Sequence, residues 1–118
     1  TDIVKLGVLA FAIQVPIYFS IKNLAKRLRP QKSDGIRQAI SPPDKYSFPS
    51  GHSASSTLFT LIVNQYNPSL TLYFVVWMSI VWISRIALGL HYVTDVIAGV
   101  LLGLLCYIAA NNILTIFF

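Results

Sequence analysis

Four long apolar segments restrict the fold of this chain more than any other feature. They cover about residues 3–21, 50–66, 70–90 and 92–118. A polar loop from Lys22 to Phe48 follows the first segment, and short polar stretches separate the others. A helix crosses the hydrocarbon core of a membrane in about 20 residues, so three segments are long enough and the second is marginal. None of them alternates with a period of two, as a strand of a membrane barrel would. The sequence therefore predicts an all-α membrane bundle of about four spanning helices.

Composition excludes the main alternatives to a membrane protein. The 118 residues are 55% hydrophobic and only 11% charged, with a mean hydropathy of +0.66. A soluble domain carries about 25% charged residues, and a disordered chain has low hydropathy and high charge. A disulfide scaffold is excluded because Cys106 has no second cysteine to pair with. The length fits one domain, which we expect to cover residues 1–118.

The positive charges are concentrated in the first polar stretch. Of the nine Lys and Arg residues, seven lie between residues 22 and 45: Lys22, Lys26, Arg27, Arg29, Lys32, Arg37 and Lys45. Such a cluster is typical of a cytoplasmic loop under the positive-inside rule. It also suits an anionic lipid surface, a nucleic acid or a phosphorylated ligand. Composition alone leaves these readings open.

Alternating helix directions bring the polar residues of the apolar segments to one side of the membrane. The end of the first helix, the start of the second, the end of the third and the start of the fourth share that side. These ends carry Lys22 with Arg29, then His52, then Arg85, then His91 with Asp95. Ionisable groups at membrane depth are costly and are usually functional. We therefore expect any chemistry to lie at this end of the bundle.

The spacing of the polar residues at this end suggests phosphate chemistry. His91 and Asp95 are four residues apart, so on a helix they can touch, and the carboxylate can fix the imidazole tautomer. Lys22 and Arg29 suit phosphate oxygens. The alternatives are a polar pair that only packs a helix end and cations that only flank a membrane span.

A second feature points to the same chemistry. Ser50 is a good helix cap, Gly51 permits close backbone approach, and a helix N-terminus presents N–H groups to an anion. The alternative for this motif is a plain capped helix with His52 at the interface. The alternative for Arg85 is a cation at a helix end whose side chain extends to the membrane interface. Together these groups are what in-line phosphoryl transfer through a phosphohistidine requires.

Three spaced motifs connect these residues to a known family. They are Lys22 followed after six residues by Arg29-Pro30, then Pro49-Ser50-Gly51-His52, then Ser84-Arg85 followed by His91 and Asp95. In order and spacing they match K-x6-RP, PSGH and SR-x5-H-x3-D. The sequence thus resembles the type-2 phosphatidic acid phosphatase superfamily, the membrane lipid phosphate phosphatases, over residues 22–95.

The resemblance implies a role for each motif residue. His91 resembles the nucleophile that forms a phosphohistidine, Asp95 its orienting partner, and His52 the general acid for the leaving oxygen. The phosphate-binding set would be Lys22, Arg29, Ser50, Gly51 and Arg85. No metal or cofactor is implied. The implied partner is a lipid phosphate in the bilayer, such as phosphatidic acid, phosphatidylglycerol phosphate or a polyprenyl diphosphate, and not a nucleic acid.

Two expectations concern what surrounds this core. Membrane members of the family usually have about six spanning helices of this length, so the first two look absent here. Bacterial relatives often carry the site on the periplasmic face, whereas the positive-inside rule places the basic loop in the cytoplasm. Because phosphate binding explains Lys22 and Arg29, we expect a bacterial inner-membrane protein with a periplasmic site.

The rival interpretation is a non-catalytic membrane protein that binds lipid or acts as a scaffold. Gly99 and Gly103 form a small-xxx-small pair that suits close helix packing, within the bundle or between subunits. The sequence does not establish the oligomeric state. The retained His52, His91 and Asp95 argue against this rival, because a binding protein has no chemical need for a nucleophile.

Overall fold

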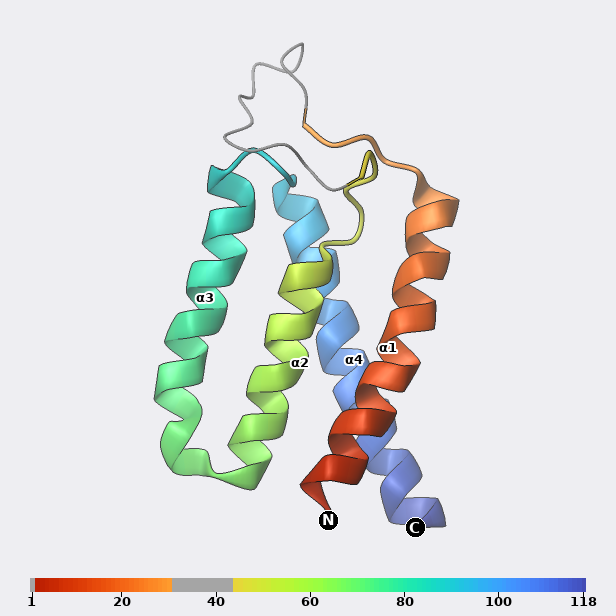
Figure 1. Cartoon of the computed structure of the whole chain (residues 1–118), viewed down its shortest axis with the longest axis vertical. Coiled ribbons are helices and arrows are strands. Elements are labelled where there is room, and N and C mark those ends of the chain that lie inside the picture. The colour runs from red at the N-terminus through yellow and green to blue at the C-terminus, as the bar shows by residue number, and fades with distance from the viewer. Residues whose placement is uncertain (1, 31–43) are drawn as a thin grey trace.

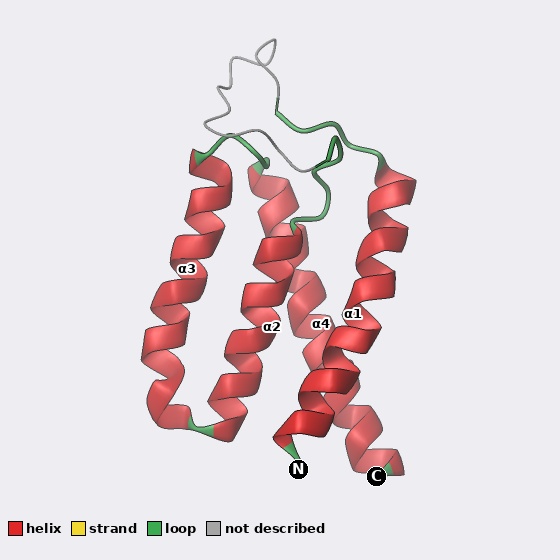
Figure 2. Cartoon of the chain, viewed as in Figure 1, coloured by secondary structure: helices red, strands yellow, loops and turns green. Residues whose placement is uncertain are grey.

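The described residues form four α-helices, as the apolar segments predict. The computed structural model describes residues 2–30 and 44–118, so Lys32 and Arg37 of the basic cluster lie outside the described residues. The helices are α1 (Ile3–Ala25), α2 (Gly51–Tyr66), α3 (Thr71–Ala87) and α4 (Val93–Phe117), and a short 3-10 helix, η2 (Pro68–Leu70), precedes α3. No β-strand occurs in the described ranges (Figure 2). The predicted all-α architecture is confirmed.

In the described part of the chain, three helical segments are long and apolar enough to cross a membrane. They are Ile3–Ala25, Pro68–Ala87 and Val93–Phe117. The second helix, α2, has 16 residues and falls short, in line with its marginal apolar length. The third, α3, has no buried residue and exposes large apolar side chains such as Leu72, Ile80 and Ile83. Exposed apolar surface of this extent requires lipid around it, so the chain is a membrane protein.

The contact between α2 and α4 holds the bundle together. A Cβ atom on Gly99 would lie 2.4 Å from the carbonyl oxygen of Ser50, and one on Gly103 would lie 2.5 Å from that of Ala54. The two backbones therefore approach as closely as only glycine permits. The small-xxx-small pair thus serves packing within the bundle.

The four helix ends predicted to converge do so. The end of α1, the start of α2, the end of α3 and the start of α4 lie at one end of the bundle, and both chain termini lie at the other (Figure 1). The first helix continues to Ala25, so Lys22 lies in its last turn, whereas the sequence predicts a loop from Lys22 onward. Lys26 ends α1 in the left-handed conformation, with φ of 48°.

A short pairing of extended segments organises this end of the bundle. Leu28 and Tyr46 form an antiparallel bridge. Beside it, the N–H of Ser47 donates to the carbonyl of Arg27 (2.8 Å), and the N–H of Arg29 donates to the carbonyl of Lys45 (3.3 Å). The pairing lays the residues after α1 against those before α2, so side chains from both segments meet above α4.

Candidate active site

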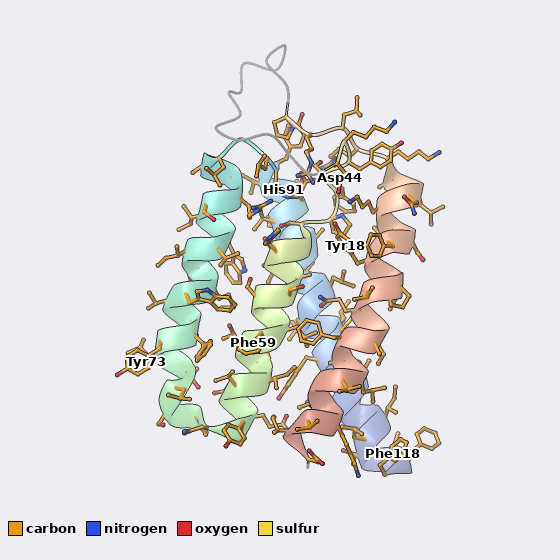
Figure 3. All side chains as sticks on the ribbon, in the orientation of Figure 1. Tyr18, Asp44, Phe59, Tyr73, His91 and Phe118 are labelled. Atoms are coloured by element: carbon orange, nitrogen blue, oxygen red, sulfur yellow. The ribbon has the colours of Figure 1, made fainter. Side chains whose placement is uncertain are left out.

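The predicted site residues gather at the end of the bundle where the helix ends converge. Figure 3 shows Tyr18, Asp44 and His91 close together there, with Phe118 at the opposite end. Each motif residue comes from one of the converging elements: Lys22 from the last turn of α1, Arg29 from the segment after it, Ser50, Gly51 and His52 from the start of α2, Arg85 from the last turn of α3, His91 from the turn before α4, and Asp95 from its first turn.

His91 is held as a neutral imidazole with one nitrogen presented to a cation. The residue is only 4% exposed, and its Nδ1 lies 2.8 Å from the carbonyl oxygen of Ser47. A carbonyl can only accept, so Nδ1 carries the proton. Nε2 then keeps its lone pair and accepts from Nη1 of Arg29 at 3.2 Å. An imidazolium would place an N–H against the guanidinium, so the arrangement requires the neutral ring.

Asp95 lies beside His91 as a charge rather than as its hydrogen-bond partner. The carboxylate is fully buried, and its Oδ2 is 3.7 Å from Nδ1 of His91, beyond hydrogen-bond reach. Oδ2 accepts from the N–H of Tyr92 at 2.7 Å, and Oδ1 accepts from Nη1 of Arg27 at 2.9 Å. The fold brings His91 and Asp95 together as the sequence predicts, but the carbonyl of Ser47 makes the direct contact that fixes the tautomer of His91.

Arg27 is the site residue that the sequence interpretation missed. The sequence interpretation leaves it in the basic cluster as part of a positive-inside loop and gives it no role in the site. Its guanidinium pairs with Asp95 and lies 5.0 Å from the ring centre of Phe48 and 5.7 Å from that of Tyr92. A buried carboxylate needs charged or N–H partners, so the presence of Asp95 in an apolar segment indicates that some cation pairs with it. The sequence spacing does not say which of seven cations supplies them.

We expect Arg27→Gln to lower the free energy of unfolding by about 1–3 kcal/mol, because it deprives a buried carboxylate oxygen of its charged partner. The matched control is Lys26→Gln, which removes the same charge from the exposed neighbouring residue. Thermal unfolding in detergent, followed by circular dichroism, measures both. Equal melting temperatures for the two variants would show that Arg27 does not stabilise Asp95.

Lys22 and Arg29 are two buried cations, and the carboxylate of Asp44 pairs with both of them. Nη2 of Arg29 donates to Oδ1 of Asp44 at 3.1 Å, and Nζ of Lys22 pairs with Oδ2. The Nε of Arg29 donates to the backbone carbonyl of Asp44 (2.8 Å), and its Nη1 donates to that of Leu90 (3.1 Å). Partial burial raises the pKa of Asp44, but hydrogen bonds from Lys22 and Arg29 outweigh it and hold that pKa below its ordinary value.

The remaining motif residues are placed around this pair. The hydroxyl of Ser50 accepts from the N–H of Ser53 (3.2 Å) and donates to its Oγ (2.8 Å), so it caps α2. His52 is exposed and lies within electrostatic range of Arg29, Arg85 and His91. The Nε of Arg85 is buried and has no hydrogen-bond partner in the described part of the chain. The three motifs therefore surround one small volume.

A cavity of about 460 Å³ leads from this volume along the groove between α1 and α2. Its walls come from both helices: Gln14, Val15, Tyr18, Phe19, Gly51, His52 and Ser55. A Cβ atom on Gly51 would lie 3.1–3.2 Å from the Tyr18 ring, so this glycine lets the two walls approach. The cavity joins the polar end to the apolar flank of the bundle.

Comparison with known proteins decides the family. The sequence profile of the PAP2 superfamily matches residues 4–116. The chain belongs to the PAP2 superfamily. The membership that the three motifs predict is confirmed, and the match extends beyond the motifs to α1 and α4.

Individual relatives are bacterial phosphatases. This PAP2 chain is 40% identical over 83 residues to decaprenylphosphoryl-5-phosphoribose phosphatase of Mycobacterium tuberculosis, a match that covers 70% of this chain and 45% of the relative. The Mycolicibacterium smegmatis protein of the same name is 36% identical over 83 residues, with 67% and 42% covered. The chain thus spans less than half the length of these curated relatives.

Two crystal structures share the fold. A PAP2-type phosphatidylglycerolphosphate phosphatase from Bacillus subtilis is 26% identical, with a TM-score of 0.74 over 94% of this chain and 58% of its own. LpxE of Aquifex aeolicus is 23% identical, with a TM-score of 0.84 over 94% of this chain and 68% of its own. Both similarities support the antiparallel arrangement of the four helices.

Proposed function

We propose that this PAP2 protein is a membrane phosphatase that removes a terminal phosphate from a lipid through a phosphohistidine on His91. The observation that carries the proposal is the state of His91. It is a buried, neutral imidazole whose Nδ1 proton is fixed by the Ser47 carbonyl and whose Nε2 lone pair faces a cation. A tautomer fixed in this way leaves the Nε2 lone pair unprotonated, so Nε2 can attack phosphorus once the Arg29 guanidinium turns to a phosphate oxygen.

In the first step, Nε2 of His91 attacks the phosphorus and the bond from phosphorus to the lipid oxygen breaks. His52 donates a proton to that oxygen, so the lipid leaves as an alcohol or as a shorter phosphate. Lys22, Arg29 and Arg85 bind the phosphate oxygens and neutralise the charge that develops on them, with the N–H of Gly51 as a further donor. The fully buried carboxylate of Asp95 stabilises the positive imidazole ring.

In the second step, water attacks the phosphorus of the phosphohistidine while His52, now neutral, accepts a proton from it. The phosphorus–nitrogen bond breaks, inorganic phosphate leaves, and His91 returns to the neutral tautomer. Among the described residues, no group of three or more His, Cys, Asp or Glu side chains could hold a metal ion. We therefore assign no step to a metal ion.

The substrate class follows from the cavity between α1 and α2. It begins at His52, where the leaving oxygen would lie, and runs toward the lipid-facing flank. A lipid whose phosphate sits at the interface could keep its tail in the bilayer and place its first carbons in this groove. Phosphatidic acid, phosphatidylglycerol phosphate and polyprenyl diphosphates fit, and the mycobacterial relatives add a prenyl-linked phosphosugar to the candidates.

The test is phosphate release by the detergent-purified chain, in the presence of EDTA, from each of these four lipid classes. We expect release from at least one of them, undiminished by EDTA. No release from any, by protein that circular dichroism shows to be helical, would overturn the proposal and favour a lipid-binding role. Activity that EDTA abolishes and Mg²⁺ restores would indicate a different chemistry.

A further inference from the structure

The carboxylate of Asp44 occupies the position that we assign to phosphate oxygens. One of its oxygens accepts from Nη2 of Arg29 at 3.1 Å, and the other pairs with Nζ of Lys22. A phosphate bound by the same two cations would place two of its oxygens on the same two donors. Asp44 and a substrate phosphate therefore compete for one subsite.

The three side chains differ in their access to water. The Asp44 side chain is 39% exposed, whereas the side chains of Lys22 and Arg29 are 9% and 6% exposed. The carboxylate can therefore turn into solvent at low cost, while the two cations cannot follow it. Leaving the two buried cations without any anion would be costly, so another anion must replace the carboxylate.

Arg29 does not depend on the Asp44 carboxylate for its position. Its Nη1 donates to the Leu90 carbonyl at 3.1 Å, and its Nε donates to the backbone carbonyl of Asp44 at 2.8 Å. Both contacts persist when only the Asp44 side chain rotates. The cation site thus stays formed during the exchange of one anion for another, and no rearrangement of the main chain is needed.

We propose that Asp44 is a displaceable internal anion. It fills the phosphate subsite of the empty protein, gives way to the substrate phosphate, and returns to Lys22 and Arg29 as inorganic phosphate leaves. This inference rests on the phosphate-binding role proposed above for these two cations. It adds a residue that belongs to none of the three motifs.

The exchange selects ligands by charge. Displacing Asp44 costs the same for every anion, so only a ligand that gains more from the cations than one carboxylate does will bind. A terminal phosphate carries close to two negative charges at neutral pH, because its second pKa is about 6. A phosphodiester headgroup carries one, as Asp44 does. Asp44 therefore disfavours the phosphodiester lipids of the surrounding bilayer.

The test is the affinity of the detergent-purified protein for inorganic phosphate and for dimethyl phosphate, measured by calorimetry. Asp44→Asn removes the charge but keeps a side-chain oxygen for the N–H of Tyr46, which donates to Oδ1 at 3.1 Å. The matched control is Asp2→Asn, which makes the same charge change where Asp2 caps α1 at the opposite end of the bundle. Asparagine caps a helix as well as aspartate does.

We expect Asp44→Asn to bind inorganic phosphate about tenfold more tightly than the wild type, the effect of one charge-assisted hydrogen-bond partner no longer competing. Dimethyl phosphate should bind detectably to this variant only, and Asp2→Asn should match the wild type. Unchanged or weaker phosphate binding by folded Asp44→Asn would overturn the proposal and make Asp44 a residue that positions the cations. If the phosphate affinities change as expected but no lipid is hydrolysed, the proposed function fails and this inference stands.

Discussion

Replacing His91 with alanine is expected to reduce phosphate release from the lipid substrate by about four orders of magnitude or more. The substitution removes the atom that would form the bond to phosphorus, and no other described side chain presents a fixed imidazole lone pair to Arg29. The helices should remain intact, because the ring contacts Ser47 and Arg29 and not the apolar contact between α2 and α4. Phosphate release and circular dichroism measure the two expectations together.

A matched variant separates the nucleophile from the acid. With an aryl phosphate, whose leaving group needs no proton, His52→Ala should still form a phosphoenzyme in one burst. His91→Ala should form none. In the His52→Ala phosphoenzyme, the phosphoryl group should be attached to His91 and be labile to acid, which peptide mapping would detect. Turnover or phosphoenzyme formation by folded His91→Ala would exclude the phosphohistidine mechanism.

The sequence predicts the parts of this site that depend on helix spacing and misses those that depend on the backbone. His91 and Asp95 are four residues apart, so their proximity could be foreseen. The contact that fixes the tautomer comes from the carbonyl of Ser47. Every residue has a carbonyl, so no sequence pattern marks this one.

Asp44 illustrates the same limit. Its carboxylate reaches Lys22 and Arg29 because residues 27–29 pair with residues 45–47. That pairing is a single bridge with two flanking hydrogen bonds and has no alternating apolar pattern to reveal it. Arg27 was missed for a related reason, since its partner Asp95 lies 68 residues away in the chain.

The fold was more accessible because hydropathy determines it. Four apolar segments that lie in the membrane permit few arrangements, and the alternation of their directions places the motif residues at one end. The end of α1 was misjudged at Lys22 because hydropathy falls there. The helix continues because the Lys22 ammonium is not in water: it pairs with Asp44 and lies near the hydroxyl of Tyr18, 3.4 Å away.

Gly99→Ala is expected to lower the free energy of unfolding by about 1–3 kcal/mol or more and to lower activity with it. The new Cβ would lie 2.4 Å from the carbonyl oxygen of Ser50, a backbone atom that can move only if α2 moves. The N–H of Ser50 donates to the carbonyl of Asp95 at 3.0 Å, so a shift of α2 also displaces His52 from the start of α4. A misplacement of about 1 Å in a catalytic group can cost about a hundredfold in rate.

Two further glycine substitutions separate the effect of Gly99→Ala on stability from its effect on catalysis. Gly103→Ala makes the same kind of clash, 2.5 Å from the carbonyl oxygen of Ala54, but one helical turn farther from the site. It should destabilise the protein about as much and reduce phosphate release less. Gly7→Ala adds a methyl group to α1 where nothing lies within 4 Å, so it should be neutral or stabilise by up to about 1 kcal/mol. Thermal unfolding and phosphate release of all three variants test this order. A Gly99→Ala protein as stable as Gly7→Ala would show that α2 and α4 are not in backbone contact, and the assembly of the site from their two N-termini would have to be abandoned.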